Sequence, residues 1–134
     1  MLLGHMGGPL WAKKDDGAWS FFKGELDPDE TLIDGARREF VEETGLAVPT
    51  GELISLGAQR SGAKTIHLFA IESDLSLEGF TPGTFEMQWP PRSGHVQTFP
   101  EIDRLAWFSI DEARRKLTKN QQPFVDALAT IIKG

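Results

Sequence analysis

Residues 24–46 of the chain read GELDPDETLIDGARREFVEETGL, and this stretch carries most of the information about the fold. It predicts one helix over Pro28–Thr44, with proline at the first helical position, where its missing N–H costs nothing. Asp27 is the expected N-cap, and Glu30 stands three residues after it, at the spacing of a capping box. Gly45 is the expected C-terminal stop, because glycine readily adopts the left-handed conformation that ends many helices.

Three glutamates gather on one face of this predicted helix. Glu39, Glu42 and Glu43 stand at spacings i, i+3 and i+4, which places them within an arc of roughly 100° beside the apolar stripe of the helix. Arg38 lies four residues before Glu42 and can pair with it, whereas nothing basic on the helix neutralises Glu39 and Glu43. A hard divalent cation would turn this repulsion into binding, since magnesium takes a few carboxylate oxygens and keeps some of its water. The spacing alone leaves two interpretations open, a metal site and an ordinary solvated helix face.

The order of residues across the stretch separates these two interpretations. From Gly24 the chain has five residues, then Glu30, then seven residues, then REFVEETGL over residues 38–46. This order resembles the Nudix box, G-x5-E-x7-R-E-U-x-E-E-x-G-U with U apolar, at all nine defined positions over 23 residues. A match of this length is far more specific than a lone glycine motif, so it favours the metal site.

The resemblance implies an enzyme, a Nudix pyrophosphohydrolase that acts on acid anhydrides. Its expected reaction is metal-dependent hydrolysis of a phosphoanhydride bond in a nucleoside diphosphate linked to another group, such as a nucleotide or a dinucleoside polyphosphate. The resemblance assigns magnesium or manganese to the Gly24 carbonyl and to the carboxylates of Glu39, Glu42 and Glu43. The physical logic agrees, because metal can neutralise the leaving group while a positioned water attacks phosphorus.

The same resemblance assigns residues for proton transfer and for orientation. Glu39 matches the position that handles the proton of the attacking water in many members, and Glu30 and Arg38 match orienting partners. The segment FPEID at residues 99–103 resembles a later acidic loop of the family, where an additional glutamate often reaches the metals or acts as the base. Glu101 is the candidate there, with an ordinary surface acid as an equal alternative and Glu86 as its rival.

The residues just before the box point to contacts with phosphate. Residues 19–24, WSFFKG, resemble the Trp-x-x-Pro-Lys-Gly form of dinucleoside polyphosphate and related hydrolases, so Lys23 is a candidate substrate contact. Two departures weaken that assignment: Phe22 stands where proline is usual, and Asp29 where a glycine often precedes the box glutamate. The wider pattern, including WPPRSG at residues 89–94, resembles a small bacterial subgroup of predicted NTP pyrophosphohydrolases.

Recognition of a nucleobase normally uses an aromatic face with a few polar groups. The chain has no tyrosine, and Trp89 has Arg92 close in sequence, so these two are the first candidates for substrate binding. A loop anchor packed on the domain is the alternative for Trp89. Trp11 and Trp19 are further stacking candidates, whereas Trp107 lies in a predicted strand and is expected in the core.

Composition and charge restrict the class of protein. The chain has 134 residues, which predicts a single Nudix hydrolase domain over residues 1–134. It has no cysteine, no apolar stretch long enough for a membrane span and no signal-peptide pattern at its start, so we expect a cytoplasmic protein with no membrane partner. The net charge of −6 argues against a nucleic-acid partner, and hence against the alternative of an RNA 5′-pyrophosphohydrolase. A second alternative, a non-catalytic nucleotide-sensing module, would tend to lose box glutamates, and all are present here.

The expected fold class is α/β, a Nudix-like α/β/α sandwich with a mixed sheet. Further helices are expected from a capping box at Ser109 through Leu117 and over Pro123–Ile132, and Ser73–Pro100 is expected to be long and irregular. The predicted strands are Met1–Met6, Ala18–Phe22, Leu53–Leu56, Thr65–Ile71 and Leu105–Phe108. The first strand of the family fold is missing or shortened, because few residues precede the box. Either another element fills the sheet, or an edge is open for a partner chain such as a homodimer.

Overall fold

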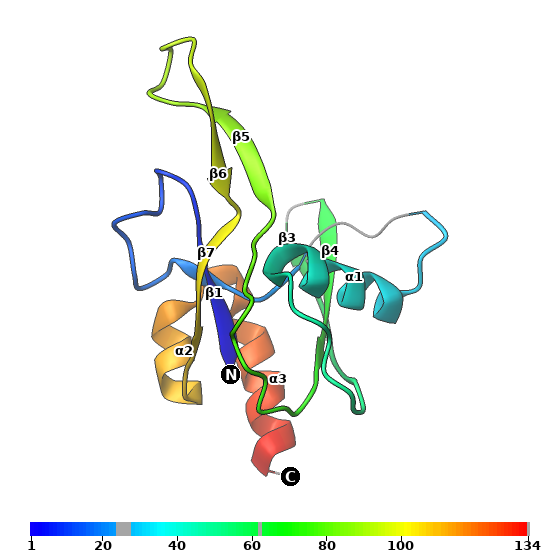
Figure 1. The fold of residues 1–134 in the computed structure, drawn as a ribbon. Coiled ribbons are helices and arrows are strands. Elements are labelled where there is room, and N and C mark those ends of the chain that lie inside the picture. The colour runs from blue at the N-terminus through cyan, green and yellow to red at the C-terminus, as the bar shows by residue number, and fades with distance from the viewer. Residues whose placement is uncertain (24–27, 62, 134) are drawn as a thin grey trace.

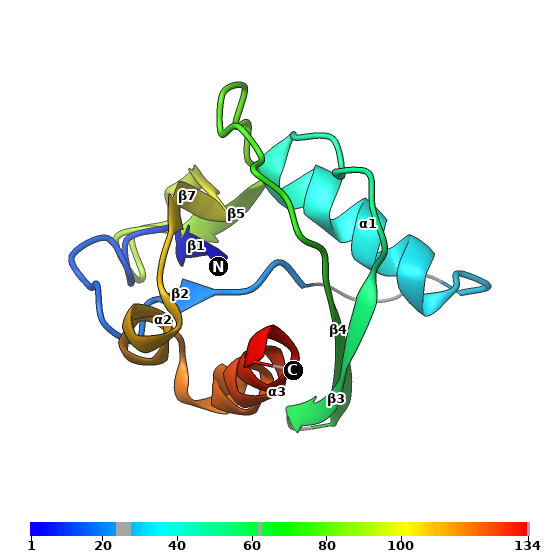
Figure 2. The ribbon, with the colours of Figure 1, turned by 90° about the horizontal axis from the view of Figure 1, so that it is seen from below.

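The computed structural model describes residues 1–23, 28–61 and 63–133 (Figure 1). Its strands and helices in chain order are β1 (Leu2–Met6), β2 (Trp19–Ser20), α1 (Leu32–Thr44), β3 (Ile54–Ser61), β4 (Lys64–Ala70), β5 (Thr84–Gln88), β6 (Val96–Pro100), β7 (Ile102–Trp107), α2 (Ile110–Lys116), a 3-10 turn (Lys119–Gln121) and α3 (Gln122–Lys133). Figure 2 shows α1 on one side of the strands and α2 with α3 on the other. The expected α/β class is confirmed, whereas the expected mixed sheet is not found, because every ladder between the described strands is antiparallel.

The described strands form three separate sheets. β1 is the central strand of the first, antiparallel to β2 on one side and to β7 on the other. β3 and β4 form an antiparallel hairpin, and β5 and β6 form a second hairpin that projects from the body as an arm (Figure 1). Among these strands, no ladder joins β4 to the sheet of β1.

A large groove runs along the open side of β4. It has a volume of about 1300 Å³, and every residue from Lys64 to Ser73 contributes to its wall. Because successive side chains of a strand point to opposite faces, such an unbroken run means that the groove follows the backbone edge of β4. The opposite wall includes apolar residues of β1, α1 and α3, such as Leu2, Phe40 and Leu128. Among the described strands, this edge of β4 therefore has no paired strand, which agrees with the second of the two alternatives, an open edge.

The core lies where β1 and β2 meet the two C-terminal helices. Leu3, Trp19, Leu117 and Val125 are buried there, and the Trp19 ring packs edge-to-face on Phe108 with centroids 4.9 Å apart. Burial of this apolar surface provides the main stabilisation and holds α2 and α3 on the sheet. In the part of the chain that the structure describes, no helix has the length and apolar character needed to cross a bilayer.

A buried histidine adds a polar anchor to this core. His5 of β1 is fully buried, with Nδ1 2.7 Å from Asp103 Oδ1 of β7 and Nε2 2.6 Å from the Lys14 carbonyl oxygen. The two contacts tie the central strand to its neighbour and to the loop that follows β1. No local sequence pattern indicates this role of His5, because one partner is distant in the chain and the other is a backbone carbonyl.

Several expected elements need correction. Helix α1 begins at Leu32 rather than at Pro28, and its N-cap is Thr31, whose hydroxyl accepts a hydrogen bond from the Asp34 amide. The expected N-cap Asp27 lies outside the described residues. Glu30 bonds to Arg38 instead of closing a capping box at the helix start. The expected helix start was based on the local capping-box spacing of Glu30. In the structure Glu30 instead pairs with Arg38, eight residues later in the chain.

The segment Ser73–Pro100 is not irregular throughout, because it contains the β5–β6 hairpin. Phe85 pairs with Phe99 across the hairpin, with ring centroids 6.0 Å apart. Its strand pairs span a turn too long to be recognised from short-range sequence signals. Trp107 is also not a core residue: it is 48% exposed and contributes to the wall of the β4 groove.

Candidate active site

The box helix α1 is held in place by a cap at its end and an aromatic contact along its length. Gly45 ends it in the left-handed conformation with φ 69°, and its amide donates to the Val41 carbonyl, as expected. Phe40 packs edge-to-face on Phe22, with ring centroids 5.5 Å apart. Phe22, the departure from the usual proline, therefore anchors the segment before the box to the helix.

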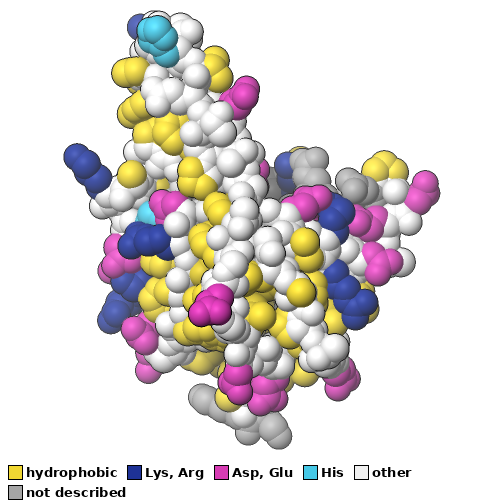
Figure 3. All heavy atoms as spheres, viewed as in Figure 1, with side chains coloured by type: hydrophobic (Ala, Val, Ile, Leu, Met, Phe, Trp, Pro, Cys, Tyr) yellow, Lys and Arg dark blue, Asp and Glu magenta, His cyan; other side chains and the backbone are white. Residues whose placement is uncertain are grey.

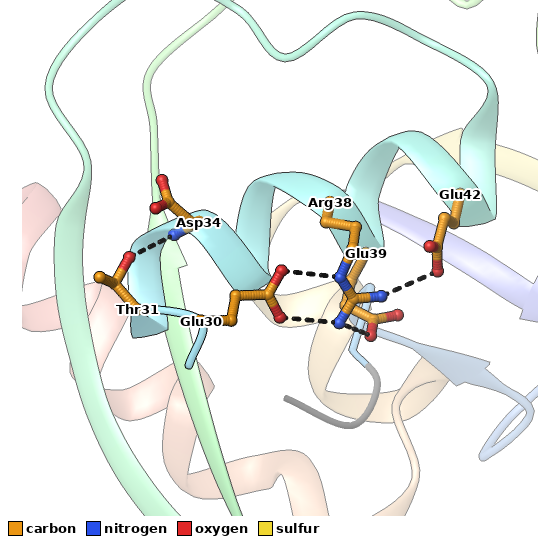
Figure 4. Close-up of polar contacts among 6 residues, drawn as sticks. All are labelled: Glu30, Thr31, Asp34, Arg38, Glu39 and Glu42. Carbon is orange, nitrogen blue, oxygen red and sulfur yellow. Dashed lines mark hydrogen bonds and ion pairs between the residues drawn. The ribbon is translucent and has the colours of Figure 1, made fainter. Parts of the chain in front are cut away.

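Arg38 is the centre of an ion-pair network on α1 (Figure 4). Its Nε and Nη2 lie 2.8 Å and 3.0 Å from the two carboxylate oxygens of Glu30, so the pair is bidentate. Nη1 lies 3.0 Å from Glu42 Oε2, and Nη2 also lies 2.9 Å from Glu39 Oε1. The expected pairing with Glu42 is confirmed, and the expectation that nothing on the helix neutralises Glu39 was wrong. The fork of guanidinium N–H groups reaches the preceding loop and two turns of the helix at once.

Glu43 differs from its neighbours because one of its oxygens is buried. Burial is the main cause that raises the pKa of its carboxyl from 4.5 to about 8. The nearby charges of Glu39 and Glu101 act in the same direction, whereas the charge and the backbone of Lys23 act against it. The Oε2 atom of Glu43 has no hydrogen-bond partner among the described residues. A buried oxygen without a partner is costly, so it requires a specific reason.

Glu39 shares part of this environment. Burial raises the pKa of its carboxyl, and the adjacent Arg38 opposes that shift. The negative charges of Glu42 and Glu30 raise the same pKa to a smaller extent. Burial, rather than repulsion between the carboxylates, is therefore the main reason that the charged form of Glu39 is disfavoured.

Glu101 reaches the box helix from the joint between β6 and β7. Its backbone amide donates to the Gly83 carbonyl at 2.9 Å, and its own carbonyl accepts from the Gly7 amide at 2.9 Å. Its carboxylate is close enough to Glu43 to contribute to the raised pKa of that residue. The candidate from the later acidic loop thus lies beside the box, whereas its rival Glu86 is an exposed residue on β5.

Comparison with known proteins gives the family. The family model of the NUDIX domain matches residues 2–128. The chain belongs to the Nudix family. Among solved structures, it is similar to the solution structure of the E. coli ORF135 protein, with 25% sequence identity and a TM-score of 0.56. That similarity covers 98% of this chain and 80% of the other.

Membership in the Nudix family carries a general chemistry. Nudix domains are hydrolases that act on pyrophosphate bonds of nucleoside diphosphate derivatives, and they generally use divalent metal ions. In this Nudix domain, no three acidic or histidine side chains among the described residues are grouped closely enough to hold an ion as they stand. The donor set nevertheless fits a hard cation: Glu43 offers a buried oxygen without a described partner, next to Glu39. Gly24, the expected carbonyl ligand, lies outside the described residues.

The expected substrate residues do not all lie near the Nudix box. Lys23 does, because its backbone and its charge both act on Glu43. Trp89 and Arg92 lie at the turn of the β5–β6 arm, which Figure 1 shows projecting away from the body. Trp89 is half-buried, and its backbone bonds to His95 and Gln97 within the arm. The structure therefore separates these two residues from the box carboxylates.

Two alternative stacking residues can also be placed. Trp19 is 4% exposed and donates through its ring nitrogen to Asp15, so its face is unavailable to a nucleobase. Trp11 is half-buried and lies under the ammonium group of Lys14, 5.1 Å from the ring centroid. In the view of Figure 3, basic side chains are interspersed with acidic ones, which agrees with the net charge. Neither tryptophan contributes to the group of residues around Glu43.

Proposed function

We propose that this Nudix domain is a magnesium-dependent hydrolase of a nucleotide or a dinucleoside polyphosphate, with manganese as an alternative metal. The observation that carries the proposal is the buried Oε2 of Glu43, which lies without a described partner in a cluster of negative charge. A site for a neutral ligand would leave the energetic cost of this buried, unpaired carboxylate oxygen without compensation. A divalent cation and a polyphosphate together would balance it.

Each residue of the box has a separate task in this proposal. Glu39, Glu42 and Glu43, with the Gly24 carbonyl, would hold the metal, which when bound supplies charge neutralisation to the phosphate oxygens. Arg38 holds Glu39 and Glu42 on the same side of α1, as its ion pairs indicate. Because Arg38 is also tied to Glu30 by two bonds, this arrangement is stiff before any ligand arrives.

In this proposal, proton transfer is assigned to Glu101, a carboxylate outside the Nudix box. Glu101 would accept the proton of the attacking water, since it is exposed and its backbone is bonded on both sides. Lys23 would contact the substrate phosphate, and its position next to Glu43 supports that assignment. Trp89 and Arg92 would bind the nucleoside part of the substrate. Because they lie on the projecting arm, this role requires either a long substrate or a movement of the arm toward the box carboxylates.

A substrate screen tests the proposal directly. Nucleoside triphosphates, nucleotide sugars and dinucleoside polyphosphates are offered with magnesium, with manganese and with EDTA. We expect hydrolysis by the wild type and by Glu52→Gln, an exposed acid before β3, and loss of most hydrolysis in Glu43→Gln. Tight nucleotide binding without turnover would instead establish a sensing module. Preferred release of pyrophosphate from RNA 5′ ends would establish the RNA-directed alternative.

A further inference from the structure

The segment Thr81–Gly83, here called the strap, links the end of the box helix to Glu101. The Thr81 amide donates to the Thr44 carbonyl at 2.8 Å, at the last residue of α1. The Gly83 carbonyl accepts from the Glu101 amide at 2.9 Å. Three consecutive residues therefore set how far the Glu101 backbone lies from the helix that carries the other carboxylates.

Within the strap, Gly83 occupies the space between two acidic residues. A Cβ atom at this position would lie 3.1 Å from the Glu42 carbonyl oxygen and 3.6 Å from Glu101 Oε2. The first distance is tighter than ordinary packing, and the carbonyl belongs to a helix that cannot move freely. The second is an ordinary van der Waals contact, so an added methyl group would act on Glu101 through a shift of the strap rather than by direct contact. The backbone of Gly83 does not have the left-handed conformation that favours glycine. The lack of room for a side chain, rather than the backbone conformation, is therefore the reason for a glycine here.

We propose that Gly83 is a positioning residue for Glu101: the absence of a side chain lets the strap lie close to the Glu42 carbonyl at the end of the box helix, and the Gly83 carbonyl then holds the Glu101 backbone so that the carboxylate lies beside Glu43. The inference rests on the proposed function, because it assumes that Glu101 is the base. Even a small outward movement of that carboxylate would lengthen its path to a water held at the box. A displacement of about 1 Å at a reacting group can cost on the order of 10²-fold in rate.

The test replaces Gly83 by alanine and measures turnover and substrate affinity separately. For Gly83→Ala we expect kcat to fall about tenfold or more, with KM within about twofold, since binding groups are untouched. Gly17→Ala is the matched control: it also adds one methyl group at a glycine, at φ 75° with nothing within 4 Å. It should lose stability through backbone strain and keep kcat within about twofold of the wild type. Glu101→Asp, which withdraws the carboxylate directly, should reproduce the fall in kcat.

A double-mutant cycle distinguishes positioning from general damage. In the Glu101→Gln background, Gly83→Ala should have little further effect on kcat, because the group it positions is already gone. An equal loss in both backgrounds would overturn the inference, and so would unchanged kcat in Gly83→Ala.

A readout without activity keeps the inference separate from the proposed function. In metal-free protein at pH 9, where Glu43 is ionised, the coupling between Glu43→Gln and Glu101→Gln in the free energy of unfolding measures how close the two carboxylates lie. We expect Gly83→Ala to reduce this coupling, because repulsion falls with distance. If the wild type hydrolyses none of the substrates, the proposed function fails and the coupling still decides the position of Glu101. An unchanged coupling would overturn the role of Gly83.

Discussion

Replacing Glu43 by glutamine removes the charge from the box while keeping the volume of the side chain. In the metal-free protein this charge is unfavourable, since burial and the neighbouring acids raise the pKa of the carboxyl to about 8. The Glu43→Gln protein should therefore be more stable than the wild type without metal, although it has lost a residue of the proposed site. That combination is unusual, because most substitutions destabilise.

The sign and size of the effect follow from proton linkage. Glu43 has a folded-state pKa near 8 and an ordinary value of 4.5, so the folded protein binds more protons between these limits. The destabilisation is absent below pH 4.5, grows as the pH rises to about 8 and is complete above it. A shift of this size corresponds to at most about 5 kcal/mol, at about 1.4 kcal/mol per pKa unit. Because the residue is only half-buried, screening should reduce the measured gain to about 2 kcal/mol.

Urea denaturation of both proteins measures this difference at pH 5, close to the ordinary pKa of 4.5, at pH 7, between the two pKa values, and at pH 9, above the raised pKa of about 8. In EDTA, we expect the two stabilities to agree near pH 5 and Glu43→Gln to be the more stable at pH 9. Saturating magnesium should stabilise the wild type by about 3 kcal/mol at one hundred times its Kd and Glu43→Gln by much less. Glu52→Gln, an exposed acid, should behave as the wild type throughout. Equal stability of wild type and Glu43→Gln in EDTA at pH 9 would refute the buried-charge reasoning, and equal stabilisation by magnesium would refute the ligand role.

Three further predictions concern the base, the core and the open edge. Glu101→Gln should lower kcat by about 10²-fold or more with little change in stability, and a similar loss in Glu86→Gln alone would transfer the role to that residue. His5→Leu should destabilise the fold by about 2–4 kcal/mol in a denaturation experiment, because Asp103 and the Lys14 carbonyl lose their buried partner; unchanged stability would contradict the anchor. The open edge of β4 leads us to expect a homodimer, and light scattering that gives a 14.9 kDa particle at high concentration would contradict it.

The sequence by itself determined the features that depend on neighbours in the chain. Gly45 ends α1, and Ser109 with Glu112 forms the expected capping box of α2, because caps involve residues within one turn. The spacing of the box residues was sufficient to predict the family, and the match over residues 2–128 confirms it. Each of the two caps rests on hydrogen bonds between residues that are close in the chain.

Tertiary structure decided the features that depend on residues far apart in the chain. Glu101 was one of three candidate bases, with Glu39 and Glu86, and only the course of β6 and β7 places it beside Glu43. Gly83 was an ordinary loop glycine in the sequence, because its neighbours Glu42 and Glu101 come from other segments. Trp107 has the pattern of a core residue and is exposed, since it lies in the wall of the β4 groove. The burial of Glu43 and the raised pKa of its carboxyl are set by segments that are far apart in the chain and packed together, and no local sequence pattern reveals that packing.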